Sequence, residues 1–260
     1  MNYWQNRMME SQRRLTNKNI KQINKQLRKY YGSSMNHVIS EFESVYNKVL
    51  AQQAEGKQVT PALLYNLDKY WQLQAQMRQE LRKLGDRQIS TMSKVFETQF
   101  FEIYYSIEVE GATAFNTLDS AVVQQLITQI WCADGKNFSQ RVWNNTELLI
   151  ETLNEELVQC VVTGKKTSEL KRVLQERFDV SYNNADMIAR TELAHIQTQA
   201  AQKRYQDYGV QEVEVLVDED ERTCPICAKH EGERHPINAQ MPIPFHPRCR
   251  CCIVPVVEIE

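Results

Sequence analysis

Apolar residues recur every three or four positions along most of the chain, a spacing that places them on one face of an α-helix. The first stretch covers residues 5–31 and is expected to end near Gly32, and a second continues to Gly56. A third helix is expected to begin at Thr60-Pro61, since Thr can cap a helix and Pro is tolerated in its first turn, and to end at Gly85.

The same helical pattern continues through the middle of the chain. The predicted elements are a helix capped by Asp86 that runs to Gly111, shorter helices over residues 118–131 and 139–163, one capped by Thr167 or Ser168, and one from Asn183-Asn184 to Tyr208, before Gly209. Neither a glycine-rich phosphate loop nor a period-two strand interrupts this part of the sequence. The fold class predicted from the pattern is therefore mainly α.

The pattern changes near the C-terminus, where β-branched residues cluster. Val213–Val217 is predicted to form a strand, and Ile253–Val257 a second strand, which Pro255 confines to an edge or breaks. The long helices are thus followed by a small β-rich tail, which also contains most of the cysteines.

The tail combines a Cys-x-x-Cys motif with a second group of soft ligands 19–24 positions further on. A tight Cys-x-x-Cys turn can offer two thiolates to one zinc ion, and a structural zinc site needs four such ligands. The predicted site is Cys224, Cys227, Cys249, and either Cys251 or His246. The alternative is that the cysteines are reduced core residues.

Two further observations on the cysteines affect this prediction. On an extended segment, Cys249 and Cys251 would lie on one face and Cys252 on the other. Cys132 and Cys160 stand alone in helical segments and are interpreted as small buried hydrophobes.

A catalytic zinc is less favoured, because such sites keep an open position beside an acid or base, and the nucleobase deaminase pattern is absent.

Charge is distributed unevenly, although the formal net charge of the 260 residues is only −2. Residues 1–31 contain eight basic residues and a single acidic one, Glu10. Such a helix can contact DNA phosphates, dock an acidic protein surface, or present an ordinary solvated face. The candidate DNA- or partner-binding residues are Arg13, Arg14, Lys18, Lys21, Lys25 and Arg28.

Several motifs occur together in a fixed order: Ala189–Glu192, the helix up to Gly209, Asp220–Cys227, Gly232, and Pro244–Cys251. In this order they resemble the Mu-type head morphogenesis domain of tailed phages, the family of minor head (minor capsid) proteins. The resemblance covers about residues 120–257. It implies a helical N-terminal region over residues 1–116 and an α+β head morphogenesis domain over residues 117–260, with residues 213–257 as its β-rich, zinc-binding tail.

The resemblance implies a non-enzymatic role at the portal or in the procapsid interior, supporting head assembly and DNA packaging or delivery. The implied partners are the portal protein, a major capsid or scaffolding protein and phage DNA, with no membrane involved during assembly. The expected location is the host cytoplasm during assembly and the portal-proximal capsid afterwards. Some relatives carry a toxin or transferase domain after this module, and none is expected after Glu260.

Two other functions stay open at this stage. A zinc-dependent hydrolase or nuclease would need an open metal position beside a carboxylate such as Glu231 or Glu233. A non-specific DNA-binding protein would act through the basic first helix. We predict no catalytic residues. Arg190 and Glu192 are interpreted as structural anchors that hold the cysteine loop or the acidic end of the first predicted strand. His195 is interpreted as a packed histidine.

Overall fold

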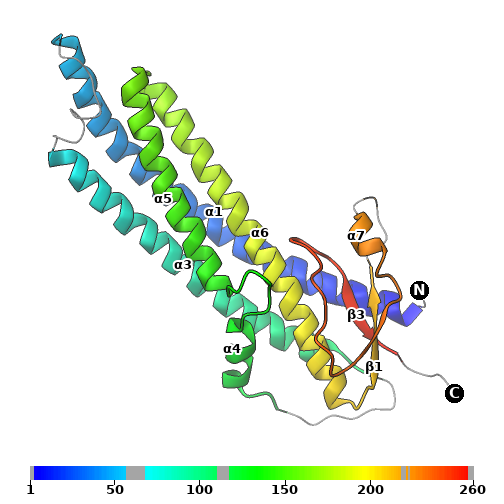
Figure 1. The fold of residues 1–260 in the computed structure, drawn as a ribbon. Helices are drawn as coiled ribbons and strands as arrows, with labels where there is room; N and C mark the ends of the chain where they lie inside the picture. Colours follow the sequence, from blue (N-terminus) through cyan, green and yellow to red (C-terminus); the bar gives the residue numbers. More distant parts are fainter. Residues whose placement is uncertain (1–2, 57–67, 110–116, 218–220, 222, 257–260) are drawn as a thin grey trace. The chain divides into compact units, whose positions relative to one another are not determined.

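A computed structural model of the chain describes residues 3–56, 68–109, 117–217, 221 and 223–256 (Figure 1). Long helices make up most of it, and a short antiparallel sheet lies near the C-terminus. In chain order the elements are α1 (Tyr3–Ala54), α3 (Asp68–Ser106), α4 (Ser120–Thr128), α5 (Phe138–Thr163), α6 (Thr167–Asp207), β1 (Glu212–Leu216), α7 (Pro225–Ala228), β2 (Arg234–Pro236) and β3 (Cys252–Pro255). The mainly helical class with a small β-rich tail is confirmed.

The long helices run through three of the predicted breaks. Gly32 lies inside α1, Gly85 inside α3, and Asn183-Asn184 inside α6, so the predictions that helices end or begin at these residues were wrong. Glycine in a helix interior costs only about 1 kcal/mol relative to alanine. Burial of the apolar residues on both sides of each position outweighs that cost.

Other predicted helix ends are confirmed. Gly56, Gly164 and Gly209 each follow a helix with φ between 61° and 81°, a left-handed conformation that glycine adopts without strain. The helices α4 and α5 agree with the predicted ranges to within three residues. The predicted start at Thr60-Pro61 and the predicted end at Gly111 lie outside the described residues.

The sheet has the strand order β2-β1-β3, and both pairings are antiparallel. Strand β1 agrees with the prediction to within one residue, and β3 is an edge strand that ends at Pro255, where the missing N–H would interrupt a longer ladder. Strand β2 was not predicted, because three residues are too few to show a period of two.

The described structure divides into two compact units. Unit 1 consists of residues 1–24, 91–138 and 187–260, and unit 2 consists of residues 25–90 and 139–186. The predicted boundary between residues 116 and 117 falls at the edge of a segment outside the described residues and stays a prediction. Among the described residues, no helix has a stretch both long and apolar enough to cross a bilayer.

In unit 2, segments of α1, α3, α5 and α6 pack around a buried apolar core. Two polar side chains in it share one acceptor: Tyr31 donates from its hydroxyl group to the carbonyl of Ser181 at 3.2 Å, and the amide of Asn145 donates to the same carbonyl at 2.9 Å. Burial raises the pKa of Tyr31 to about 12. Gly85 faces the ring of Trp143, and a Cβ atom at this position would lie 2.7 Å from Cζ3. The glycine therefore makes room for the indole.

In unit 1, the sheet packs against the first turns of α1. Leu216, Cys252 and Val254 form a buried apolar cluster, against which Met8 and Met9 pack. This arrangement attaches the C-terminal tail to the N-terminal helix.

A second contact between the helices of unit 1 is polar. Gln99 of α3 donates to Oγ1 of Thr16 at 2.6 Å, and that hydroxyl donates to Oε1 of Gln197 on α6 at 2.6 Å. Asn19 also donates to Oε1 of Gln99, at 2.7 Å. Because buried amides need specific partners, this chain of hydrogen bonds favours one register of α1, α3 and α6.

Candidate metal centre

The two cysteines of the Cys-x-x-Cys motif lie at the short helix α7. Cys224 is its N-cap residue, and its Sγ atom accepts a hydrogen bond from the backbone N–H of Cys227 at 3.3 Å. Pro225 occupies the first helical position, where the N–H that it lacks has no helical partner. The turn brings both sulfur atoms into one group with the imidazole of His246, all within 4.8 Å of one another.

The other ligands come from the turn that precedes β3. Arg248 has a left-handed backbone conformation with φ of 65°, and the N–H of Cys249 donates to the carbonyl of His246 at 3.1 Å. The backbone N–H of Arg248 donates to Oγ1 of Thr191 at 3.1 Å, which ties the turn to α6. Cys249 and Cys251 are buried, and with Cys227 they form a second group within 4.8 Å.

His246 is held in the tautomer that a metal ligand needs. Its Nδ1 atom lies 2.8 Å from the carbonyl oxygen of Pro247, which can only accept, so Nδ1 carries the proton. Nε2 is then left with its lone pair, and it lies 3.2 Å from Sγ of Cys224 and 3.0 Å from Sγ of Cys227. A backbone carbonyl in this position is a common partner of histidine ligands to zinc.

One pair of sulfur atoms has the spacing expected in a zinc coordination sphere. A Zn–S bond of about 2.3 Å and tetrahedral angles place two thiolates about 3.8 Å apart. Sγ of Cys227 lies 3.7 Å from Sγ of Cys249, and all the cysteines are free rather than disulfide-bonded. A cavity of about 40 Å³ borders Cys224, Cys227, His246 and Cys251, which is room for one ion. The donor set therefore fits zinc.

Hydrogen bonding within the cluster distributes the thiolate charge. Donation from the Cys251 thiol lowers the pKa of Cys249, and the same hydrogen bond raises the pKa of Cys251. The backbone N–H of Cys227 lowers the pKa of Cys224, whereas burial raises the pKa of Cys227. Each of the two groups thus contains one cysteine that favours the thiolate form, which is the form that binds metal.

All five predicted metal ligands converge: Cys224, Cys227, His246, Cys249 and Cys251. Cys252 lies outside both groups, in the apolar cluster under the sheet, as alternation along an extended segment predicts. Cys160 is buried as expected, whereas Cys132 lies in the loop between α4 and α5 and is only half-buried.

The two residues predicted to be structural anchors lie in the middle of α6, not at a helix start. Oε2 of the buried Glu192 accepts a hydrogen bond from the indole N–H of Trp131 at 3.0 Å. The Trp131 ring also stacks on His195, with ring centroids 4.2 Å apart, so His195 is packed as expected. The contact to Trp131 was not predicted. Arg190 lies near the cysteine turn and lines a cavity with Arg248.

The candidate DNA- or partner-binding residues are all exposed on α1. Their contacts within the protein include an ion pair between Lys18 and Glu102 and a hydrogen bond from Nε of Arg28 to the hydroxyl group of Tyr182 at 3.1 Å. Arg13, Arg14, Lys18 and Lys21 belong to unit 1, and Lys25 and Arg28 belong to unit 2. Their binding role stays a prediction.

The carboxylates that a hydrolytic zinc site would require are engaged elsewhere. Oε2 of Glu231 accepts from the backbone N–H of Val217 at 2.5 Å, and Oε2 of Glu233 lies 2.6 Å from Nδ1 of His230. The His230 ring stacks on Phe245, with ring centroids 4.0 Å apart. These contacts brace the loops around the cysteines.

The geometry thus defines a mainly helical domain that carries a small antiparallel sheet and a cluster of cysteine and histidine side chains. Residues 151–254, from α5 through β3, match the family described as Phage Mu protein F like protein. This segment is therefore similar to a Phage Mu F-like domain, whose family is one of phage head morphogenesis and minor capsid proteins. The resemblance inferred from the sequence motifs is confirmed, with all five candidate ligands inside the matched segment.

Among curated proteins, the chain is similar to the NAD(+)–arginine ADP-ribosyltransferase EFV of Enterococcus faecalis. The two are 24% identical over 117 residues, which are 44% of this chain and 24% of that protein. The chain therefore matches about a quarter of the length of this relative. No solved structure matches the chain.

Proposed function

We propose that this protein is a non-enzymatic minor head protein of a tailed phage, acting in head morphogenesis. The observation that carries the proposal is the match of residues 151–254 to the Phage Mu F-like family, because this segment includes the sheet and the whole cysteine cluster. In the proposed setting the protein is located in the capsid near the portal. Its partners are the portal protein, a capsid or scaffolding protein and the packaged DNA.

The cysteine cluster is proposed to bind a structural zinc ion. The two ligand groups share Cys227 and together offer five candidate protein ligands for four tetrahedral positions, enough to close a coordination sphere without water. The strands of the sheet have only five, three and four residues, too few to be stable alone. A bound ion would fix α7 and the turn before β3 against each other.

An enzymatic role has less support. A hydrolytic zinc centre needs an open position and a nearby base, and both carboxylates considered for that role have other partners. The similarity to an ADP-ribosyltransferase covers only about a quarter of that enzyme, which gives little support for assigning the activity in its name to this chain.

The test is the composition of phage heads. Procapsids and mature virions from cells carrying the encoding genome would be purified on gradients and analysed by quantitative mass spectrometry. The proposal expects this protein to cosediment with the portal protein in a fixed ratio, and heads made without the gene to be defective. Absence from both particles, or normal infectious heads without the gene, would refute the proposal.

A further inference from the structure

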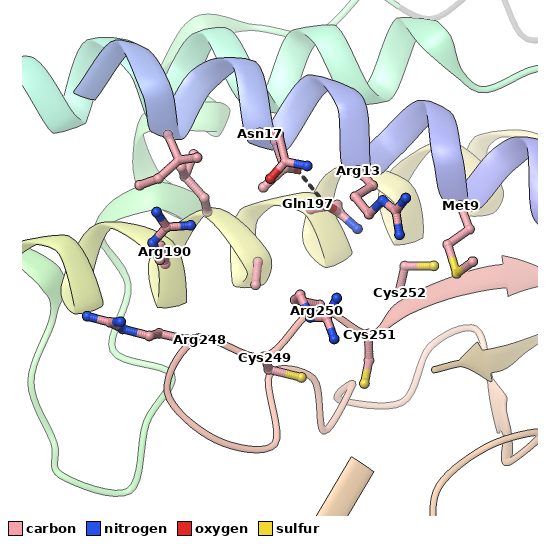
Figure 2. Close-up of a pocket in the computed structure, with 14 residues that line it drawn as sticks. Met9, Arg13, Asn17, Arg190, Gln197, Arg248, Cys249, Arg250, Cys251 and Cys252 are labelled. Carbon is pink, nitrogen blue, oxygen red and sulfur yellow. Dashed lines mark hydrogen bonds between the residues drawn. The ribbon is translucent and has the colours of Figure 1, made fainter. Parts of the chain in front are cut away.

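A cavity of about 550 Å³ lies beside the cysteine turn, within unit 1. Figure 2 shows it between α1, α6 and the turn that leads into β3. Four of the 14 lining residues are arginines, and none of these 14 residues is acidic. The arginines are Arg13 from α1, Arg190 from α6, and Arg248 and Arg250 from the turn.

The rest of the lining is suited to a polar ligand. Amide groups of Asn17 and Gln197 provide neutral hydrogen-bonding groups, and Ile20 and Leu193 contribute apolar surface. Arg190 and Arg250 are half-buried, so their charges are less screened by water than those of fully exposed side chains. A cavity of this volume is in the usual range for small-ligand sites.

Two of the four arginines are shared with the cysteine cluster. Arg248 and Arg250 also border the small cavity at the ligand groups, where they can offset the charge of thiolates. Arg13 and Arg190 do not border that small cavity. They line the larger one from two different helices, and the described residues that line it include four arginines and no carboxylate.

We propose that this cavity binds phosphoryl groups of a polyanion. Guanidinium groups pair with phosphate oxygens through two parallel hydrogen bonds, and several phosphoryl groups in series match several arginines around one cavity. The phosphoryl groups come either from a free oligophosphate or from the backbone of a nucleic acid that enters the cavity. The binding site is independent of the proposed role in the head, since its arginines and its cavity are features of unit 1 itself.

The experiment measures binding of inorganic tripolyphosphate to the zinc-loaded full chain by isothermal titration calorimetry at low salt. Arg190→Gln and Arg250→Gln should each weaken binding by roughly tenfold or more, the usual effect of losing a hydrogen bond between charged groups. The control is Arg172→Gln, which removes the same charge from an exposed site on α6 where Arg172 pairs with Glu176. It should bind like the parent protein.

A second measurement avoids substitutions. Phenylglyoxal modification, mapped by mass spectrometry, should be suppressed by tripolyphosphate at Arg190 and Arg250 and unchanged at Arg172. Tripolyphosphate that fails to bind, or that protects all three arginines equally, would overturn the proposal.

Competition with two other polyanions shows whether the cavity selects phosphoryl groups and which molecule supplies them. Duplex DNA that displaces tripolyphosphate, and whose own binding falls in Arg190→Gln, would identify the nucleic acid backbone as the source of the phosphoryl groups. DNA binding that is indifferent to this substitution would identify a free oligophosphate. Displacement by a hexaglutamate peptide at equal charge concentration would overturn the phosphoryl assignment and indicate an acidic protein segment.

Discussion

Replacing Cys227 by serine should remove the metal and destabilise the unit that contains the tail. Its sulfur atom is the one donor common to both ligand groups, and the residue is only 4% exposed. Serine is a poor zinc ligand, so the variant keeps at most a distorted remnant of the site. Cys227→Ser therefore tests the cluster at its most sensitive position.

The size of the effect follows from binding linkage. At free zinc one hundred times above the dissociation constant, a site that exists only in the folded protein contributes about 2.7 kcal/mol. For a protein of this size, each kcal/mol of lost stability lowers Tm by roughly 2–4 °C. Loss of the site should therefore lower the transition of unit 1 by about 5–10 °C, and added chelator should lower the parent protein by a similar amount.

The assay combines zinc quantification by mass spectrometry with calorimetry in zinc and in chelator. The matched control is Cys252→Ala, which removes a neighbouring buried cysteine that lies in the apolar cluster with Leu216 and Val254. It should lose some stability through packing and still contain one equivalent of zinc. A parent protein whose Tm is unchanged by chelator, or a Cys227→Ser variant with full zinc content, would refute the reasoning.

Two further predictions concern the helices. Gly32→Ala should stabilise unit 2 by about 1 kcal/mol in urea unfolding, because nothing lies within 4 Å of the added Cβ atom. Gly85→Ala should destabilise unit 2, because the added Cβ atom would lie 2.7 Å from the Trp143 ring. Stabilisation by both substitutions would contradict the packing. If α1 binds DNA, Arg14→Gln and Lys21→Gln should each reduce the slope of log affinity against log salt by about one, measured by fluorescence anisotropy. An unchanged slope in both would exclude these contacts.

Local patterns in the sequence predict the helices well but not where they end. Gly32 and Gly85 resemble Gly56 and Gly164 in sequence, yet the first two lie inside helices and the last two adopt positive φ after them. The difference is set by packing, because a helix continues past glycine wherever the flanking faces are buried by other elements. Such burial depends on distant segments and leaves no local signal.

The candidate metal centre was largely predictable, because its ligands come from two short turns close together in the sequence and their spacing is informative. The arginine-lined cavity was not, since Arg13, Arg190 and Arg250 come from three segments far apart in the chain. Arg13 was noted only as part of a basic helix, and Arg190 only as an anchor. Their placement around one cavity depends on the register of α1 against α6, which the partly buried hydrogen bond between Thr16 and Gln197 favours.

The turn before β3 joins three features of unit 1. Cys249 and Cys251 belong to the ligand groups, Arg248 and Arg250 line the larger cavity, and Cys252 packs in the apolar cluster under the sheet. Because alternate residues of one segment serve all three, a metal ion that orders the turn also places two of the four arginines. Coupling between two binding sites is reciprocal, so zinc should tighten tripolyphosphate binding by the same factor by which tripolyphosphate tightens zinc binding.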